Sequence, residues 1–306
     1  MPDRVEPSQS SGEATKRHGM TVSVLVPSSL AREAPDKREA TRKLGDIARA
    51  ATVFRADRLV IYPDPTGENG VDWDGGFVET VLRYVVTPPH LRKEEWGSRD
   101  ELEYVGVLPP LCAMPRTGSG SDDSGSLRQG IVTEVGSEGR VRVNCGLQHP
   151  VSLRLPPDRT GTEGERVTVR INSRRPVRAQ IVDEPLPGPR VECADLLSAL
   201  DRPDAGLRVA TSRHGELLTV SRLRSLVAEI EADGLTVAFG APKRGLSAIL
   251  ADHPEVTGPF PPSVEPSSVP ADRFDLWLNT IPHQGSEVVR TEEAVFAALA
   301  CLTLTE

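Results

Sequence analysis

Residues 21–62 read TVSVLVPSSLAREAPDKREATRKLGDIARAATVFRADRLVIY, and this stretch decides the fold class. It opens on an apolar run, Thr21–Val26, and closes on another, Arg58–Tyr62, each as long as a buried strand. Between them, Asp36 and Glu39 have the spacing of a helix-capping box, and the apolar residues that follow keep to one helical face. A strand, a helix and a strand of these lengths form a βαβ unit, which predicts a parallel sheet.

The composition is that of an ordinary globular protein. Of 306 residues, 38% are hydrophobic and 26% are charged, and no apolar run approaches the roughly 20 residues that span a membrane. The polar start, residues 1–19, lacks the apolar segment of a secretory signal and is expected to be a disordered tail. The four cysteines are scattered and no histidine cluster completes a metal site. We therefore expect reduced, mostly buried thiols, no metal, no membrane and a cytoplasmic location.

The charged residues are unevenly distributed. A formal net charge of −8 argues by itself against a nucleic-acid partner. However, residues 125–185 hold ten arginines against seven acidic residues, whereas residues 245–306 hold two against nine. The basic balance therefore lies in the middle of the chain.

That middle part also differs in its expected secondary structure. A linker is indicated at 116–126 by its Gly, Ser and Asp content. Five short strand-like runs follow it and predict a small antiparallel OB-like barrel. These runs are 130–135, 140–145, 151–155, 166–171 and 177–182. A second linker is expected at 185–189 because of its prolines.

On either side of the barrel the chain has α/β character. Ahead of it, a second helix is expected at 76–86. Behind it, strands are expected at 207–211, 235–239 and 275–278, and helices at 219–232 and 291–302, with Thr291 as the cap of the last one. The predicted organisation is a tail (1–19), an α/β domain in two parts (20–115 and 189–306), and a linker with the inserted barrel (116–188).

Three glycine-bearing loops directly follow predicted strands of the C-terminal part. They are Thr211–Gly215, Gly240–Gly245 and Asn279–Gly285. In open parallel sheets ligands bind at the carboxyl ends of strands, and glycine lets the backbone approach a ligand closely or adopt positive φ. Each loop could equally be an ordinary turn. Neither a P-loop nor a GxGxxG dinucleotide motif is present in the sequence, so spacing alone attaches no ligand class to these loops.

Several stretches resemble the SPOUT (α/β-knot) superfamily of methyltransferases. Its three motifs resemble residues 45–61, 240–246 and 281–294. One branch is closer still, the archaeal and eukaryotic RNA methyltransferases whose knotted domain carries an inserted OB-like barrel. Its signature stretches are similar to Val26–Leu30, Thr87–Lys93, Leu108–Leu111 and Asn279–Ala294. The resemblance covers Met20–Glu306 in the family's order and with its insertion.

This resemblance implies an α/β fold with a SPOUT trefoil knot, and S-adenosyl-L-methionine as the cofactor. Main-chain groups at Gly240 and around Asn279–Ile281 would hold the adenine and ribose. Either Arg213 or His214 would reach the methionine carboxylate or ribose, and which of the two does so stays open. The full set of candidate cofactor residues is Thr211, Arg213, His214, Gly215, Gly240, Lys243, Gly245, Asn279, Thr280, Ile281, Gln284, Gly285 and Thr291.

Arg49 falls where related ribose methyltransferases place a catalytic arginine. Because a guanidinium is a poor base, Arg49 would orient phosphate or stabilise the activated nucleophile. The alternative is a surface arginine paired with Asp46 or Glu39 on the same helix.

Arginines on the predicted barrel are the candidate RNA contacts. They are Arg140, Arg142, Arg154, Arg170, Arg174 and Arg175. OB surfaces bind single strands through basic grooves. Stacking aromatic residues are missing from this segment of the sequence, and a solvated basic face is the alternative.

The resulting prediction is an S-adenosylmethionine-dependent RNA methyltransferase that acts on ribosomal RNA, with a uridine base nitrogen as the acceptor that family membership favours. The rival hypothesis is a non-catalytic RNA-binding or ribosome-assembly factor that retains the knotted scaffold. Knotted methyltransferases of this kind pair as homodimers. The final helix offers an apolar stripe for such a contact, Val295, Phe296, Leu299 and Leu302, although the stripe could equally pack on its own sheet.

Overall fold

A computed structural model of the chain describes residues 20–64, 75–109, 111, 113, 126–137, 139–155, 160–184, 187–241, 244–251 and 273–305. The predicted tail at 1–19, nearly all of the predicted linker at 116–126, and the candidate residue Lys243 lie outside these ranges.

A six-stranded parallel sheet forms the centre of the α/β part. Its strand order is β11-β9-β10-β1-β2-β8, and every described pairing within it is parallel, as the βαβ pattern predicts. The strands are β1 (Val22–Pro27), β2 (Arg58–Tyr62), β8 (Arg190–Cys193), β9 (Leu207–Leu217), β10 (Leu235–Ala238) and β11 (Leu276–Asn279). Only β8 has no counterpart among the strands expected from the sequence. It joins the two parts of the domain, because it lies after the inserted segment and pairs with β2 ahead of it.

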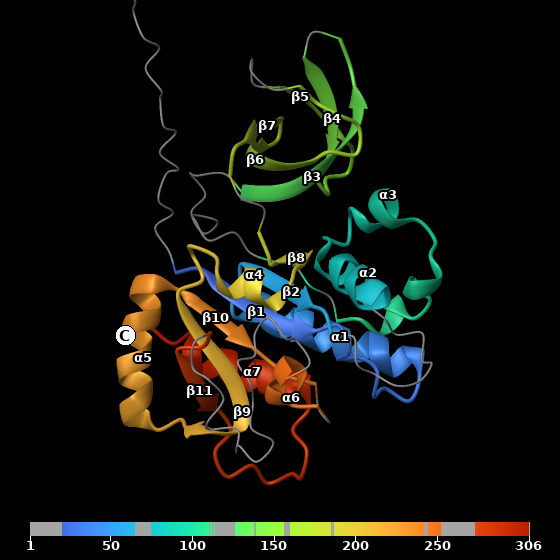
Figure 1. Cartoon of the computed structure of the whole chain (residues 1–306). Coiled ribbons are helices and arrows are strands. Elements are labelled where there is room, and N and C mark those ends of the chain that lie inside the picture. Colours follow the sequence, from blue (N-terminus) through green and yellow to red (C-terminus); the bar gives the residue numbers. More distant parts are fainter. Residues whose placement is uncertain are drawn as a thin grey trace, which may run out of the picture.

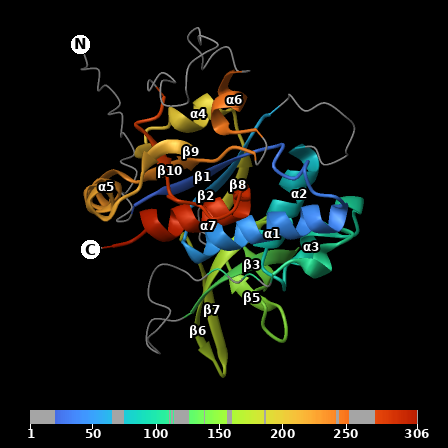
Figure 2. The ribbon, with the colours of Figure 1, turned by 90° about the horizontal axis from the view of Figure 1, so that it is seen from below.

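Helices cover both faces of this sheet. Figure 2 shows α1, α2 and α7 along one face and α4 and α6 on the other. The bounds are α1 (Lys37–Val53), α2 (Gly75–Val86), α4 (Leu196–Leu200), α5 (Val220–Asp233), α6 (Leu246–Ala251) and α7 (Thr291–Leu302). Alternate residues of β1 explain the two cores: Val24 packs toward α1 and α7, whereas Leu25 packs toward α4 and α6. A strand buried on both sides reads as a continuous apolar run, as TVSVLV does.

The start of α1 bears out half of the expected capping box. The Asp36 side chain accepts a hydrogen bond from the Glu39 backbone N–H at 2.7 Å. The Glu39 carboxylate pairs with Arg42 one turn later. Asp36 therefore caps the helix without the reciprocal bond, and the motif is an N-cap rather than a full box.

The inserted segment forms a separate five-stranded antiparallel sheet of order β5-β4-β3-β6-β7. Its strands are β3 (Ser126–Val135), β4 (Arg140–Asn144), β5 (Val151–Arg154), β6 (Arg166–Arg174) and β7 (Val177–Val182). The outer strands β5 and β7 contact each other, so the sheet curls into a nearly closed barrel around its own apolar core. Figure 1 shows this barrel, in green, beside the α/β part and next to the short helix α3 (Arg92–Trp96). All five predicted strands are present.

The apolar stripe of α7 packs mainly within its own domain. Val295, Leu299 and Leu302 are fully buried in the core that α7 shares with α1 and the sheet. Phe296 is 47% exposed, and its ring lies edge-on to Phe54, with 5.0 Å between the centroids. The alternative that the stripe covers its own sheet is thus confirmed for three of the four residues. None of the helices within the described ranges is both long and apolar enough to cross a membrane.

Candidate functional site

The first predicted loop is a five-residue excursion within β9. Neighbouring residues of β11 show this, because Trp277 lies opposite Ala210 whereas Leu278 lies opposite Glu216. Residues 211–215 therefore bulge out of the ladder before the strand resumes and ends at Leu217. The prediction that the strand ends at Thr211 is wrong. A bulge re-aims side chains beside a sheet edge, which gives this segment the protruding character that the sequence assigned to a loop.

Gly215 allows the strand to rejoin the ladder. A Cβ on Gly215 would lie 2.8 Å from the backbone nitrogen of Leu278, so no larger residue fits without moving β11. The neighbouring Thr211 anchors the other end of the bulge, since its hydroxyl donates to the carbonyl of Ala238 in β10 at 2.8 Å.

Asn279 binds the first and third predicted loops together. Its side-chain amide donates to the carbonyl oxygen of Arg213 at 2.9 Å, and its Oδ1 accepts from the backbone N–H of Ile281 at 3.0 Å. The residue is 9% exposed, so water competes little for these bonds. A single amide thereby fixes the main chain on both sides of the β9–β11 edge.

Thr291 links α7 to the second loop. Its hydroxyl donates to the carbonyl oxygen of Gly240 at 3.3 Å. The expectation that Thr291 caps α7 is wrong: the N-cap is Arg290, whose backbone N–H donates to the Glu293 carboxylate at 2.8 Å. With its hydroxyl turned toward Gly240, Thr291 brings the second loop to the start of the last helix.

Positive φ does not explain the candidate glycines of the three loops. None of the four candidate glycines has φ in the left-handed region, whereas His283 does, at 59°. A Cβ on Gly240 would lie 2.4 Å from the Leu246 nitrogen, so close approach within the chain explains this glycine. Among the described residues, a Cβ on Gly285 would have no atom within 4 Å, and a Cβ on Gly245 would have the Ser247 hydroxyl at 3.9 Å. These two leave room for another molecule.

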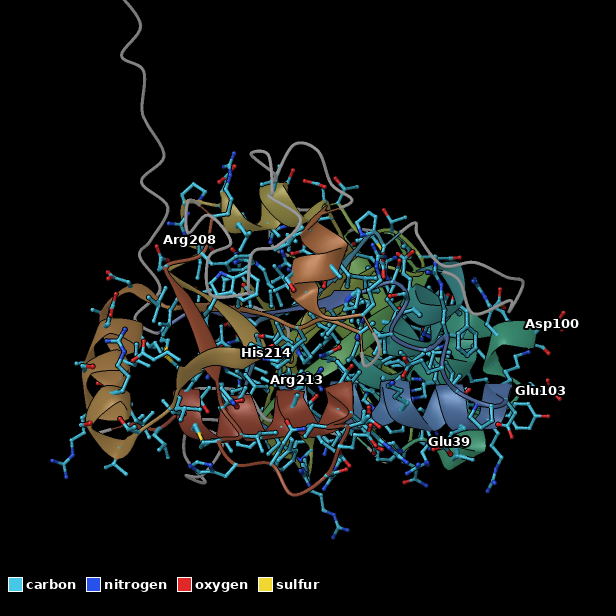
Figure 3. The ribbon with its side chains drawn as sticks, turned by 60° about the horizontal axis from the view of Figure 1, so that its bottom comes forward. Glu39, Asp100, Glu103, Arg208, Arg213 and His214 are labelled. Atoms are coloured by element: carbon cyan, nitrogen blue, oxygen red, sulfur yellow. The ribbon has the colours of Figure 1, made fainter. Side chains whose placement is uncertain are left out.

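Arg213 and His214 project from the bulge. Both side chains are exposed, and the Arg213 Nε lies 3.0 Å from the His214 Nε2. Figure 3 shows them next to each other beside β9, with Arg208 farther along the same strand. Thr280 and Gln284, in the third loop, are half-buried, and Gln284 donates to the carbonyl of Ser286 at 2.8 Å. Gln284 thus shapes its own loop.

A polar cluster that the sequence did not reveal lies at the carboxyl ends of β1, β2 and β10. Asp64 is buried, accepts from the Ser29 hydroxyl at 2.5 Å and pairs with Arg244. Beside it the Tyr62 hydroxyl donates to the carbonyl of Phe239 at 2.5 Å, and burial raises the pKa of this phenol well above its usual range. The cluster stands next to the second loop at the same edge of the sheet. Asp64 and Arg244 alone are 180 positions apart, which is why no local pattern indicates the cluster.

The candidate catalytic residue Arg49 lies on α1 with its side chain exposed. The ion pairs considered as its alternative role belong to Arg42, which pairs with Glu39 and, at 3.8 Å, with Asp46. Arg49 is therefore placed on the surface of the helix that packs against α7.

The barrel arginines fall into three groups. Arg140 and Arg154 are exposed and directly opposite each other on β4 and β5. Arg142 lies 3.4 Å from Glu134, and with Arg140 it lines a hollow of about 230 Å³. Arg170 is half-buried and pairs with Glu184, whereas Arg174 and Arg175 are exposed where β6 turns toward β7. The arginines on β4 and β5 therefore lie together, whereas those on and after β6 lie apart from them.

Residues 21–302 match the model of the family described as "Putative RNA methyltransferase". The chain belongs to this family.

Relatives extend over nearly the whole chain of this RNA methyltransferase family member. An uncharacterized protein of Haloarcula marismortui is 65% identical over 288 residues, which are 94% of this chain and 100% of that protein. The 28S rRNA (uridine-N(3))-methyltransferase of Homo sapiens is 28% identical, covering 98% of this chain and 82% of the human protein. The enzyme of the same name from Mus musculus is 28% identical, covering 92% and 76%. The family predicted from the motifs is confirmed.

Proposed function

We propose that the protein transfers a methyl group from S-adenosyl-L-methionine to the N3 atom of a uridine in ribosomal RNA. The observation that carries the proposal is the way hydrogen bonds anchor all three loops. Asn279 joins the third loop to the first, Thr211 ties the first loop to the end of β10, and Thr291 ties the start of α7 to the second loop. Ligands of open parallel sheets bind at the carboxyl ends of strands. The names of the human and mouse relatives supply the acceptor atom.

For the fold, the proposal includes a trefoil knot in the C-terminal part. Two features support the knot. β11 is the outermost strand of the sheet, next to β9, and the start of α7 returns to the second loop, where Thr291 contacts Gly240. True knots are nearly absent from proteins, so this part rests on the family. The inserted barrel is proposed to be OB-like because its five antiparallel strands curl around one small core.

The residues at the edge fit the proposed cofactor. Main-chain groups at Gly240 and Asn279–Ile281 would hold adenine and ribose, since hydrogen bonds within the protein already fix their positions. The exposed guanidinium of Arg213 and the adjacent ring of His214 suit the methionine carboxylate. Gly245 and Gly285 are not crowded by the described residues, which suits the approach of a ligand. When bound, the cofactor supplies a methyl group that its sulfonium has already activated.

The acceptor requires more from the protein. Uridine N3 carries a proton at neutral pH, and this proton would have to pass to solvent water before N3 could accept the methyl group. A cation near the uracil would stabilise the negative charge that develops on it. Arg49 is proposed for this role because it stays protonated.

RNA is proposed to lie across β4 and β5 of the barrel. Two like charges directly across neighbouring strands, here Arg140 and Arg154, repel each other unless an anion lies between them. A backbone phosphate would be such an anion, and Arg142 adds a third charge beside it. We further propose a cytoplasmic homodimer, for which the exposed ring of Phe296 and the neighbouring Val53 on α1 offer an apolar contact.

Two measurements test the proposed function. Calorimetric titration with S-adenosyl-L-methionine is expected to show one site per chain, and incubation with ribosomal RNA is expected to yield 3-methyluridine in nucleoside mass spectrometry. If the protein does not bind S-adenosyl-L-methionine at millimolar concentration, the proposed enzymatic activity is wrong. The rival hypothesis, a non-catalytic RNA-binding or ribosome-assembly factor, would then be favoured.

A further inference from the structure

His90 connects the α/β part to the inserted barrel. It belongs to the stretch Thr87–Lys93, to which the proposed function gives no role. Its Nε2 lies 3.0 Å from the carbonyl oxygen of Gln129 in β3, and its own carbonyl accepts from the Asn144 amide of β4 at 3.4 Å. One residue thus contacts two strands of the barrel.

The corner that carries His90 is held firmly to α2. Arg92 donates to the carbonyl of Thr87 at 2.9 Å, and its guanidinium lies 4.8 Å from the centre of the Tyr84 ring. The Trp96 indole donates to the Thr87 hydroxyl at 3.1 Å. Because these contacts fix the turn between α2 and α3, His90 has a defined position relative to the parallel sheet.

Further contacts surround the one made by His90. The Asn144 amide also donates to Glu94 at 2.9 Å, and Arg166 of β6 lies 3.7 Å from Glu95. The buried side chain of Gln129 donates to the carbonyl of Pro187 at 2.6 Å, so it holds the segment by which the chain leaves the barrel. Three strands and the exit segment are therefore fastened to the turn between α2 and α3 or to one another.

The shape of the barrel is matched to His90 at one point. Gly146 has a φ of +74°, and a Cβ there would lie 3.0 Å from the His90 ring. Its backbone N–H donates to Asn144 Oδ1 at 3.1 Å, which keeps the turn against the imidazole. A larger residue here would adopt an unfavourable conformation and would also press on the His90 ring.

We propose that His90, Asn144 and Glu94 form a fixed joint that sets the orientation of the barrel relative to the methyl-transfer site. They are positioning residues: the joint decides which nucleotide of a structured RNA reaches the site when the barrel holds the backbone elsewhere. The inference rests on the proposed function. A small rotation at the joint is amplified at Arg140 and its partner Arg154, because Arg140 begins β4 whereas Asn144 ends it.

Gly146→Ala tests the joint, and Gly164→Ala is its matched control. Both glycines are in the barrel and have positive φ, +74° and +82°, but no atom of the described residues lies within 4 Å of a Cβ at Gly164. Both variants should therefore carry the same backbone strain, and only Gly146→Ala should press on His90. We expect Gly146→Ala to raise the KM for a ribosomal RNA fragment about tenfold over the control. The Kd for S-adenosyl-L-methionine and the Tm should be equal in the two variants.

A double variant distinguishes reorientation from general damage. His90→Ala removes the ring that Gly146→Ala presses on, so adding Gly146→Ala to His90→Ala should raise the KM no further. Equal KM values for Gly146→Ala and Gly164→Ala, or additive effects in the double variant, would overturn the joint. If the wild type binds RNA but not S-adenosyl-L-methionine, the proposed function is wrong, whereas the proposed joint is not yet contradicted. The Kd for RNA is then measured for the same variants in place of the KM, and the same outcomes support or overturn the joint.

Discussion

The side-chain amide of Asn279 donates a hydrogen bond to the carbonyl oxygen of Arg213, 66 positions earlier in the chain, at 2.9 Å. This bond holds the bulge of β9 against the loop that follows β11, and the same side chain accepts from Ile281. Two segments that are separate in sequence therefore have one shared support. The support lies where the proposed cofactor would contact the main chain.

Asn279→Ala is expected to weaken the binding of S-adenosyl-L-methionine more than it weakens the fold. The substitution removes the partner of two part-buried groups, the Arg213 carbonyl and the Ile281 N–H, which costs at most about 1–3 kcal/mol. Because the loss falls on the cofactor loops, the Kd should rise about tenfold or more. Calorimetric titration measures it, with Ser225→Ala on the exposed side of α5 as the control. A Kd equal to that of the control would contradict the role of Asn279.

Gly215→Ala is expected to disturb β11 and with it the cofactor site. The added methyl would lie 2.8 Å from the Leu278 nitrogen, and backbone cannot yield as a flexible side chain can. The matched control is Gly106→Ala, since Gly106 also lacks a positive φ and has nothing within 4 Å. Thermal unfolding should give a lower Tm for Gly215→Ala only, by several degrees, which corresponds to about 1–3 kcal/mol of overpacking. Equal Tm values would show that the bulge adapts.

Much of this architecture could be predicted from local patterns, because buried strands and capped helices carry their signals within a few residues. The run from Thr21 to Val26 and the cap at Asp36 are examples. The bulge of β9 could not be, since the sequence from 207 to 217 does not show which residues β11 leaves unpaired. The cluster of Ser29, Asp64 and Arg244 was missed for the same reason: it forms only when three strands end side by side.

The paired arginines of the barrel should control the salt dependence of RNA binding. Replacing both Arg140 and Arg154 by Gln removes up to two phosphate contacts. The negative slope of the logarithm of the RNA association constant against the logarithm of salt concentration should therefore become shallower by about 1.4–1.8. Affinity should drop for all RNA sequences alike, while the Kd for S-adenosyl-L-methionine stays the same. Arg224→Gln, at an exposed position of α5, is the control. An unchanged slope in the double variant would favour a merely solvated basic face.

Breaking the buried ion pair between Lys43 in α1 and Glu292 in α7 should make the stability of the fold depend on pH. The two charged atoms are 3.8 Å apart, with side chains 9% and 10% exposed. Burial lowers the pKa of Lys43 and raises the pKa of Glu292, so both charges are costly and depend on each other. Lys43→Met removes the buried cation and leaves the carboxylate with the exposed Arg290, 4.0 Å away, so the change costs at most about 3–5 kcal/mol.

The sign of the pH effect follows from the raised pKa of Glu292. The folded protein takes up this proton more readily than the unfolded chain, so the carboxyl favours folding at low pH and loses that contribution as pH rises through its folded pKa. The Tm deficit of Lys43→Met should therefore be smaller at about pH 5 than at about pH 8. Arg42→Met is the matched control, because Arg42 is the next residue on α1 and its ion pair with Glu39 is exposed. It should cost less than about 1 kcal/mol at either pH. Equal deficits for Lys43→Met at the two pH values would show that Glu292 finds another partner.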